Sequence, residues 1–204
     1  MEEVGSTHVV EIVEEFRKKH PRRVAYEIFH FEELGVPQTR HRLIAGSPEL
    51  IAKLLRMRDT QPRRSIADVV PHPRGTHIRT GNYSVSRKKK TIPDGRESMY
   101  IYQKAELGDS CHSIYGPSPT ILAGFALGWV TKTDGKAHSR LSLTPRESAL
   151  IQTFPTSYKF PASNKLALMH AGNAVPPLVA TLLMRPSPRQ GRRPLSPSLV
   201  IFPE

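Results

Sequence analysis

Residues 24–46 read VAYEIFHFEELGVPQTRHRLIAG, and this stretch decides the local fold. Apolar and polar side chains alternate over residues 24–29, which predicts a strand. Residues 35–37 predict a turn, because glycine and proline favour tight changes of chain direction. Residues 42–45 predict a second strand. The stretch therefore predicts a β-rich edge that lies next to a helix.

A helix is expected on each side of this stretch. Residues 7–20 place apolar side chains on one face and basic side chains at the C-terminal end, which the helix dipole favours. Pro21 ends this helix. The apolar face is Val9, Ile12, Val13 and Phe16. Ser47 and Pro48 suit the N-cap and first position of the next helix, whose apolar stripe is Leu50, Ile51, Leu54 and Leu55.

The middle of the chain loses this periodicity. Residues 58–96 are rich in proline, glycine and basic side chains, which predicts an irregular cationic segment. Residues 99–103 and 120–122 predict short strands. Residues 58–140 are therefore expected to form a small loop-rich subdomain.

Regular structure is expected again near the C-terminus. Thr144-Pro145-Arg146-Glu147 has the pattern of a capping box, which predicts a helix over residues 145–153. A second helix is predicted over residues 164–171, with Gly172 closing it as the residue after the C-cap. Residues 175–184 predict a short buried helix, and the proline-, serine- and arginine-rich residues after Arg185 predict a flexible tail.

Charge is distributed unevenly along the chain. The 204 residues carry 30 Lys and Arg against 18 Asp and Glu, a formal charge of +12. Residues 1–50 hold 7 basic and 9 acidic groups, 51–110 hold 13 and 6, and 111–204 hold 10 and 3. An excess confined to the chain beyond residue 50 favours nucleic acid as a partner, with a solvated basic face as the alternative.

Composition argues against several protein classes. Apolar residues make up 38% of the chain, enough for a core. The longest uncharged apolar run, residues 174–184, is shorter than the roughly 20 residues that cross a bilayer. Glu2 and Glu3 stand where a signal peptide would be cationic. The single cysteine, Cys111, allows no internal disulfide and no paired-cysteine zinc site, and no metal site is expected.

We therefore expect an intracellular, soluble protein. Its expected location is the nucleus in a eukaryote, and the cytoplasm or nucleoid in a bacterium or phage.

Three blocks of sequence resemble motifs of one family. They look like the last three motif blocks of the DNA cytosine-5 methyltransferases, in that family's order, with a basic variable stretch between the first and second. The resemblance spans about residues 9–184. The blocks are GVPQTRHR at residues 35–42, Arg140-Leu141 with TPRE at 144–147 and LIQTFP at 150–155, and GNAVPP at 172–177.

The resemblance implies an α/β fold. It is the C-terminal part of a Rossmann-like, S-adenosylmethionine-dependent methyltransferase fold plus a small, loop-rich β target-recognition lobe. On this basis residues 1–46 form the edge of the catalytic core and residues 47–139 the target-recognition region. Residues 140–184 form the C-terminal core helices and the loop that closes on the cofactor, and residues 185–204 a flexible tail.

The family's chemistry assigns roles to the first block. A cytosine is flipped out of the duplex, a thiolate adds to carbon 6, and carbon 5 takes a methyl group from S-adenosylmethionine. By the Gln-x-Arg-x-Arg match, Arg42 would hold the base oxygen at position 2 and Arg40 would contact the adjacent phosphate. A guanidinium suits developing negative charge because it is always charged and presents its donors in a rigid fork. On one strand, both side chains would share a face. The alternative is two surface arginines beside a strand.

The other two blocks imply a cofactor segment and a structural brace. Asn173, Ala174 and Val175 resemble the segment near the methionine end of S-adenosylmethionine, although a loop with an Asn cap is the alternative. Thr144 caps the helix. Buried pairing that braces the recognition lobe is expected of Arg140, Arg146 and Glu147.

Double-stranded DNA is the expected partner. In the resemblance, Thr120 helps to hold the flipped nucleotide's phosphate, although a strand residue without a ligand is an equal alternative. Gln38, in the first block, is a candidate DNA contact. The basic run is a candidate for phosphate contacts, with solvated charge as its alternative; it consists of Arg87, Lys88, Lys89 and Lys90.

The family's first half is not found in these residues. The glycine-rich cofactor strand, the Pro-Cys nucleophile loop and the Glu-Asn-Val acid are absent from the sequence, and Cys111 stands in Ser-Cys-His within the recognition stretch. We therefore expect this chain alone to be inactive and to need an N-terminal catalytic half, as a split subunit or as a missing segment. The rival hypotheses are a non-enzymatic DNA-binding or regulatory module and, more distantly, an RNA-binding protein.

Overall fold

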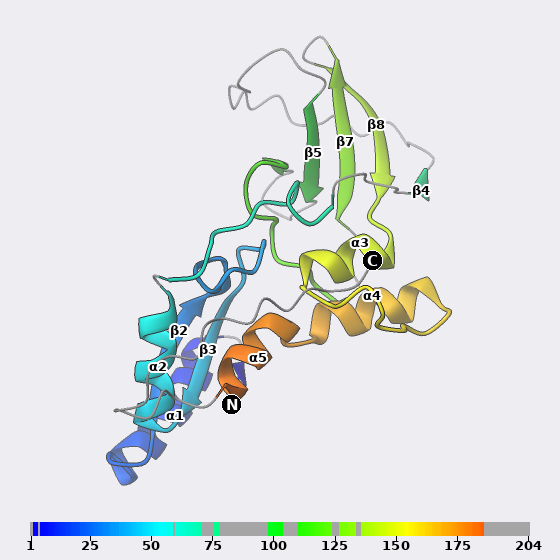
Figure 1. The fold of residues 1–204 in the computed structure, drawn as a ribbon. Helices are drawn as coiled ribbons and strands as arrows, with labels where there is room; N and C mark the ends of the chain where they lie inside the picture. The colour runs from blue at the N-terminus through cyan, green and yellow to red at the C-terminus, as the bar shows by residue number, and fades with distance from the viewer. Residues whose placement is uncertain are drawn as a thin grey trace.

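The fold is known from a computed structural model that describes residues 2–3, 5–58, 60–70, 76–77, 98–103, 110–123, 127–133 and 136–185. Figure 1 shows two sheets toward opposite ends of the molecule, with helices α3 (Pro145–Ile151) and α4 (Asn164–Asn173) between them. Mixed helices and strands agree with the expected α/β class. The basic run at 87–90 and the tail after residue 185 lie outside the described residues.

The first sheet contains the hairpin predicted from residues 24–46. Its order is β1-β3-β2, with β1 (Glu2–Glu3), β2 (Ala25–His30) and β3 (His41–Gly46) all antiparallel. The two predicted strands are confirmed to within a residue or so at each end. Between them, η1 (Phe31–Leu34) ends at Gly35, whose φ of 85° lies in the left-handed region that glycine adopts without strain.

Three helices accompany this sheet. The predicted helices are confirmed as α1 (Thr7–Lys19) and α2 (Pro48–Arg58), and the backbone N–H of Leu50 donates to Ser47 Oγ at 3.3 Å. The helix α5 (Pro177–Met184) packs its Val179 and Leu182 into the same core. The core joins the hairpin to α2 and α5 and contains Phe29, Phe31, Leu34, Val36, Ile44, Ile51, Leu54, Val179 and Leu182.

The apolar face of α1 is only partly covered. Val13 is buried, whereas Ile12 and Phe16 are each 55% exposed. A groove of about 450 Å³ runs beside them and is lined also by Val24 and Ala45. The predicted amphipathic helix is therefore correct, but half of its apolar stripe faces outward in this chain.

The second sheet lies in the stretch expected to be loop-rich. Its order is β4-β8-β7-β5-β6, and every pair is antiparallel. The strands are β4 (Thr76–His77), β5 (Ser98–Gln103), β6 (Ser110–Ser113), β7 (Gly128–Thr133) and β8 (Lys136–Ser142). Trp129, Leu143 and Ile151 belong to a second apolar cluster that joins this sheet to α3. The strand predicted at residues 99–103 is confirmed.

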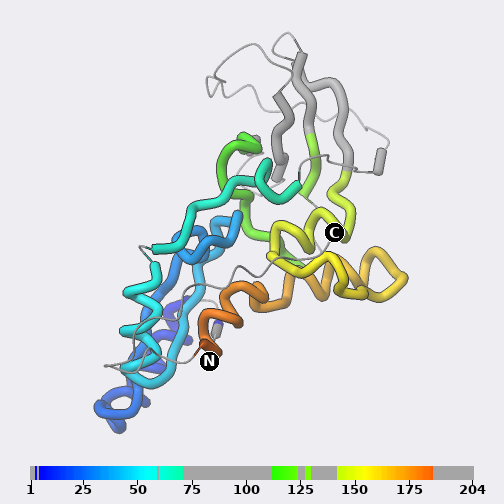
Figure 2. Tube along the Cα trace, in the orientation of Figure 1, coloured from blue at the N-terminus to red at the C-terminus, as the bar shows by residue number. Residues whose placement is uncertain are grey.

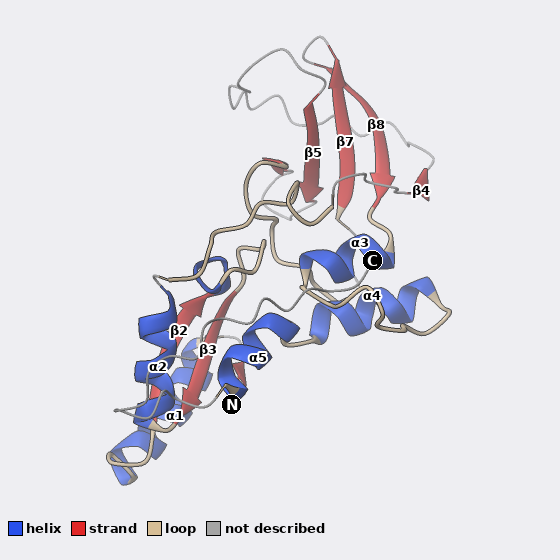
Figure 3. Ribbon diagram, in the orientation of Figure 1, coloured by secondary structure: helices blue, strands red, loops and turns tan. Residues whose placement is uncertain are grey.

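The strand predicted at residues 120–122 is wrong. These residues lie in a connecting segment in which the N–H of Ile121 bonds to a side-chain oxygen, Gln38 Oε1, rather than to a strand ladder. Residues 114–116 run beside residues 66–67, with Ile66 N–H donating to Gly116 O at 3.0 Å (Figure 2). Figure 3 shows that the segments joining the two sheets are mostly loops.

The C-terminal helices follow the sequence with one correction. The capping box at Thr144 is confirmed, and α3 ends two residues earlier than expected. Gly172 was expected just outside α4, but it lies inside the last turn, and the C-cap is Ala174. By length and composition alone, residues Asn164–Met184 could cross a membrane, with a mean hydropathy of 1.4. This is weak evidence, because the stretch is two separate helices, α4 and α5, that pack on the rest of the chain.

Candidate functional site

Gln38 is a buried connector in this structure. Its side chain is 0% exposed, and Oε1 accepts from the backbone N–H of Ile121 at 2.8 Å. Its backbone forms a parallel bridge with Ser118. A DNA contact by this side chain, which we expected, requires exposure that it does not have here. The amide therefore joins the β2–β3 connection to the segment between β6 and β7.

Arg40 occupies the same junction and is 3% exposed. Its Nη1 donates to Ile121 O and its Nη2 to Gly172 O, each at 3.2 Å. Arg40 lies just before β3, so the expectation that it shares a strand face with Arg42 does not hold. The guanidinium links two chain segments that are far apart in sequence. Its expected contact with a DNA phosphate stays a prediction.

Arg42 is the second residue of β3 and is half-buried. It stands opposite Phe29 of β2, and its Nη1 donates to His41 O at 2.7 Å. These hydrogen bonds of Arg40 and Arg42 therefore reach different parts of the chain. The role of Arg42 at a base oxygen stays a prediction.

Residues 118–121 complete the junction through backbone bonds. Thr39 N–H donates to Ser118 O at 2.8 Å, and Ser118 N–H donates to Pro37 O at 2.9 Å. The Thr120 hydroxyl donates to Thr39 O at 2.7 Å. These bonds hold the segment next to the Gln-x-Arg-x-Arg block, and the predicted phosphate contact of Thr120 is untested.

The end of α4 is held from two sides. Gln152 Nε2 donates to Ala171 O at 2.8 Å, and Arg40 donates to Gly172 O. A Cβ added at Gly172 would lie 2.4 Å from Ala123 N and 2.6 Å from the carbonyl carbon of Leu122. Only glycine lets these two backbones approach so closely. Asn173, which follows, is exposed.

Comparison with known proteins assigns the chain to a family. The family model for C-5 cytosine-specific DNA methylases matches residues 6–186. The chain belongs to this family. A "Type II methylase M.HgiDII" from Herpetosiphon aurantiacus is 27% identical over 184 residues, an alignment that covers 75% of this chain and 52% of the relative. The chain therefore spans about half the length of this methylase.

The brace expected in this methylase chain is found only in part. Glu147 is 4% exposed, and its Oε2 accepts from Thr144 N–H at 2.7 Å and from the Thr144 hydroxyl at 2.9 Å. Arg146 differs from the expectation of buried pairing, because it is only half-buried and donates to the backbone oxygen of Thr156. Arg140 lies on β8 opposite Val130. The capping role of Thr144 is confirmed.

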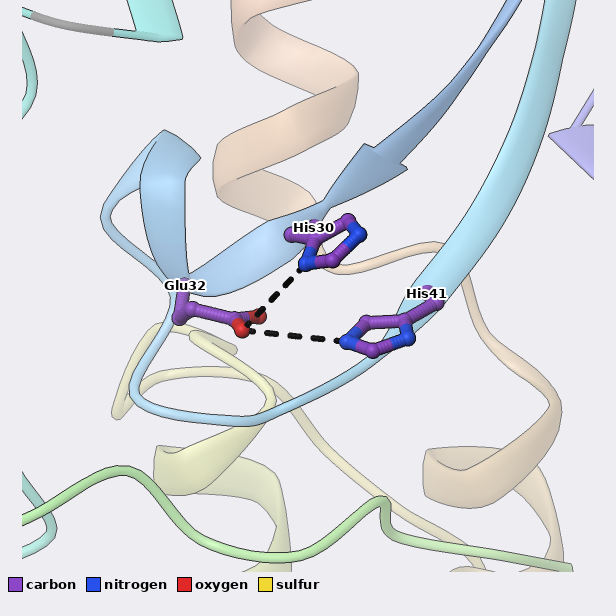
Figure 4. Close-up of side chains that lie close together, drawn as sticks. All are labelled: His30, Glu32 and His41. Carbon is purple, nitrogen blue, oxygen red and sulfur yellow. Dashed lines mark ion pairs between the residues drawn. The ribbon is translucent and has the colours of Figure 1, made fainter.

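Sequence reasoning missed two features of this part of the family domain. Gln152 is 0% exposed, and its amide donates to a carbonyl in the last turn of α4. Apart from its place in the LIQTFP block, nothing in the sequence indicated this contact. His30, Glu32 and His41 gather at the end of the β2–β3 hairpin where residues 31–40 connect the two strands (Figure 4). The available signal was that His30 and His41 end and begin the two predicted strands, which brings them opposite each other.

Proposed function

We propose that this chain forms the DNA-recognition and C-terminal part of an S-adenosylmethionine-dependent DNA cytosine-5 methyltransferase. The observation that carries the proposal is the family match over residues 6–186, together with the Arg40 side chain of the first motif block, which bonds to Gly172 O in the last block. The middle block reaches the same place through Gln152, which bonds to Ala171 O, the carbonyl just before Gly172.

The DNA-binding part of the proposal assigns recognition to the five-stranded sheet and its connections. The net positive charge beyond residue 50 supports this, because a polyanion offsets such an excess. In this proposal the basic run 87–90 contacts phosphate, and Thr120 and Arg40 lie near the flipped nucleotide. Arg40 would reach a phosphate only if its carbonyl contacts rearranged on DNA binding.

Arg42 has the catalytic role in this proposal. As the ring accumulates negative charge, a guanidinium at the base oxygen stabilises the transition state more than the ground state. Arg42 is only half-buried, so part of its side chain is accessible to a base. Its backbone position on β3 is fixed by pairing with β2.

The segment after α4 suits one end of the cofactor. S-adenosylmethionine supplies the electrophilic methyl group when it is bound. The exposed Asn173 amide offers both a donor and an acceptor, and Ala174 is extended with φ −74° and ψ 148°. Val175 packs against the first core, so it anchors the segment and leaves mainly its backbone for the cofactor.

The thiolate and the acid are proposed to come from the family's first half, which lies outside these 204 residues. Cys111 is the single cysteine, and it lies in β6, outside the three motif blocks. Support comes from the relative, of which the match covers 52%, and from the exposed Ile12 and Phe16 beside an apolar groove. We propose that this groove receives the first half.

Complementation tests the proposal. The chain would be combined with a family N-terminal half that carries the Pro-Cys and Glu-Asn-Val blocks, and methyl transfer from labelled S-adenosylmethionine to duplex DNA measured. We expect transfer by the mixture and none by either part. The test variant is Ile12→Glu, which is expected to prevent association of the two halves. The matched control is Glu11→Gln, on the exposed side of the same helix, which is expected to have no effect.

Duplex binding by the chain alone separates the rival function. If the chain binds duplex DNA with a steep salt dependence but no N-terminal half yields methyl transfer, it is a DNA-binding module and not part of an enzyme. If it does not bind duplex DNA at low salt and does not complement, both readings are wrong.

A further inference from the structure

Three ligand-type side chains meet at one end of the β2–β3 hairpin. His30 is the last residue of β2, His41 is the first of β3, and they stand directly opposite each other. Glu32 follows in η1, and its Oε1 lies 3.8 Å from His30 Nδ1 and 3.8 Å from His41 Nε2 (Figure 4). One ligand atom from each residue lies within 4.8 Å of the others. Strand pairing therefore fixes the backbone positions of the two histidines.

The carboxylate at the centre of this cluster is poorly compensated. The Glu32 side chain is 16% exposed, and its Oε2 is buried with no hydrogen-bond partner among the described residues. The nearby arginines pair with the neighbouring Glu33 instead. Arg58 Nε lies 3.9 Å from Glu33 Oε2, and Arg63 Nη2 lies 3.8 Å from Glu33 Oε1. A buried carboxylate oxygen without a donor is costly, and a cation held at Oε1 would offset that cost.

We propose that His30, Glu32 and His41 bind a divalent transition-metal ion of the zinc class. Imidazole nitrogens with one carboxylate are ligands that Zn²⁺, Ni²⁺ and Cu²⁺ accept, and three protein ligands leave a position for water. Hard ions such as Mg²⁺ prefer oxygen ligands and fit this set poorly. The site is independent of the proposed function, because it uses none of the residues assigned to DNA or cofactor.

Binding requires a modest rearrangement of the side chains. Two ligands of a tetrahedral zinc ion stand about 3.3 Å apart, given metal–ligand bonds of about 2.0–2.1 Å, so the carboxylate must approach each ring by about 0.5 Å. The two imidazole rings are stacked, with centroids 3.9 Å apart and planes at 23°. Each ring must turn to direct its lone pair at a shared ion. The side chains of His30 and His41 are 48% and 52% exposed, so both rings have room to turn.

The ion would connect three elements and would bind one residue, His41, of the Gln-x-Arg-x-Arg block. His41 lies between Arg40 and Arg42, and its carbonyl accepts from Arg42 Nη1 at 2.7 Å. Phe31 N–H donates to Arg40 O at 2.9 Å. A metal held across β2, η1 and β3 would therefore hold together the backbone from which both arginines project.

Metal titration of the whole chain, produced without a histidine tag, tests this proposal. Zn²⁺ binding would be measured by calorimetry, and Co²⁺ binding by the visible absorption that tetrahedral coordination produces. We expect one ion per chain, with affinity at least about tenfold weaker in His30→Ala, His41→Ala and Glu32→Gln. The control is His8→Ala, which removes an exposed histidine on α1 and is expected to leave affinity unchanged.

Circular dichroism identifies any variant that fails to fold, and His41→Gln and Glu32→Gln then carry the comparison because they retain side-chain bulk. Equal Zn²⁺ affinity in the natural chain and in the folded variants would overturn the proposal. So would the absence of both heat of binding and Co²⁺ absorption.

Discussion

Replacing Gly172 with alanine should destabilise the chain, although helix propensity alone predicts the reverse. Gly172 lies in the last turn of α4, where alanine is favoured over glycine by about 0.5–1 kcal/mol. The new Cβ would lie 2.4 Å from Ala123 N, 2.6 Å from Leu122 C and 2.9 Å from Ala123 Cα. All three atoms are backbone, so no side chain can rotate away and either the helix end or the 122–123 segment must move.

The size of the effect follows from these contacts. Overpacking costs about 1–3 kcal/mol, and backbone neighbours put this site at the upper end. Movement also stretches the Arg40 bond to Gly172 O, a hydrogen bond to a charged group of the kind that contributes about 1.5–3 kcal/mol. After the gain in helix propensity, we expect a net loss of about 2–4 kcal/mol in the free energy of unfolding.

Urea unfolding followed by tryptophan fluorescence measures this loss. Trp129 is the single tryptophan and is 1% exposed, in the same apolar cluster as Ile121. With an m-value of about 2 kcal/mol per M, the midpoint should fall by about 1–2 M. Gly116→Ala is the matched control, because its Cβ would meet only Ser113 O, at 3.8 Å. Equal or greater stability of Gly172→Ala than of the natural chain would refute the reasoning.

Three further predictions concern other parts of the chain. Thr144→Ala should lower the free energy of unfolding by about 1 kcal/mol, because Thr144 Oγ1 accepts from Glu147 N–H at 3.2 Å, whereas Thr144→Ser should retain most of it in the same urea assay. Lys53→Ala should lower the free energy of unfolding by about 1–3 kcal/mol, because Lys53 is 4% exposed and its Nζ donates to Leu183 O at 3.1 Å and Arg185 O at 2.5 Å. The control is Lys165→Ala, at an exposed position. Equal unfolding midpoints for the two variants would contradict this prediction. The hydrogen bond from Arg17 holds the pKa of Glu14 at about 2 instead of 4.5, so the stabilisation is present above pH 4.5 and is lost as pH falls through about 2. Arg17→Gln should return the pKa of Glu14 toward 4.5 in an NMR titration, and an unchanged pKa would show that the pair is not the cause.

Local sequence patterns predicted the elements that depend on local interactions. The alternation in residues 24–29, the Ser47-Pro48 start and the Thr144 capping box each encode their geometry within a few residues, and all three are present. The placement of Gly172 failed because its packing partner, the backbone of residues 122–123, lies about 50 positions away in sequence.

The same limit applies at the candidate site. Gln38 stays a predicted DNA contact, and its burial beside Ile121 depends on packing that no local pattern indicates. The His30–Glu32–His41 cluster needs the strand register, which sequence alternation alone did not supply. Family resemblance identified the family correctly, as the match over residues 6–186 shows, whereas the contacts of individual side chains required the fold.

The most direct test of the central claim is the nucleoside product formed when this chain is combined with a family N-terminal half, S-adenosylmethionine and duplex DNA. We predict that the product is 5-methylcytosine. Arg42→Ala should lower the rate of its formation about 10²–10³-fold, as expected for loss of one group that stabilises developing charge. Arg56→Ala, on the exposed side of α2, should leave the rate unchanged. A methylated product other than 5-methylcytosine, an Arg42→Ala rate equal to that of the natural chain, or no product with any family half would contradict the account.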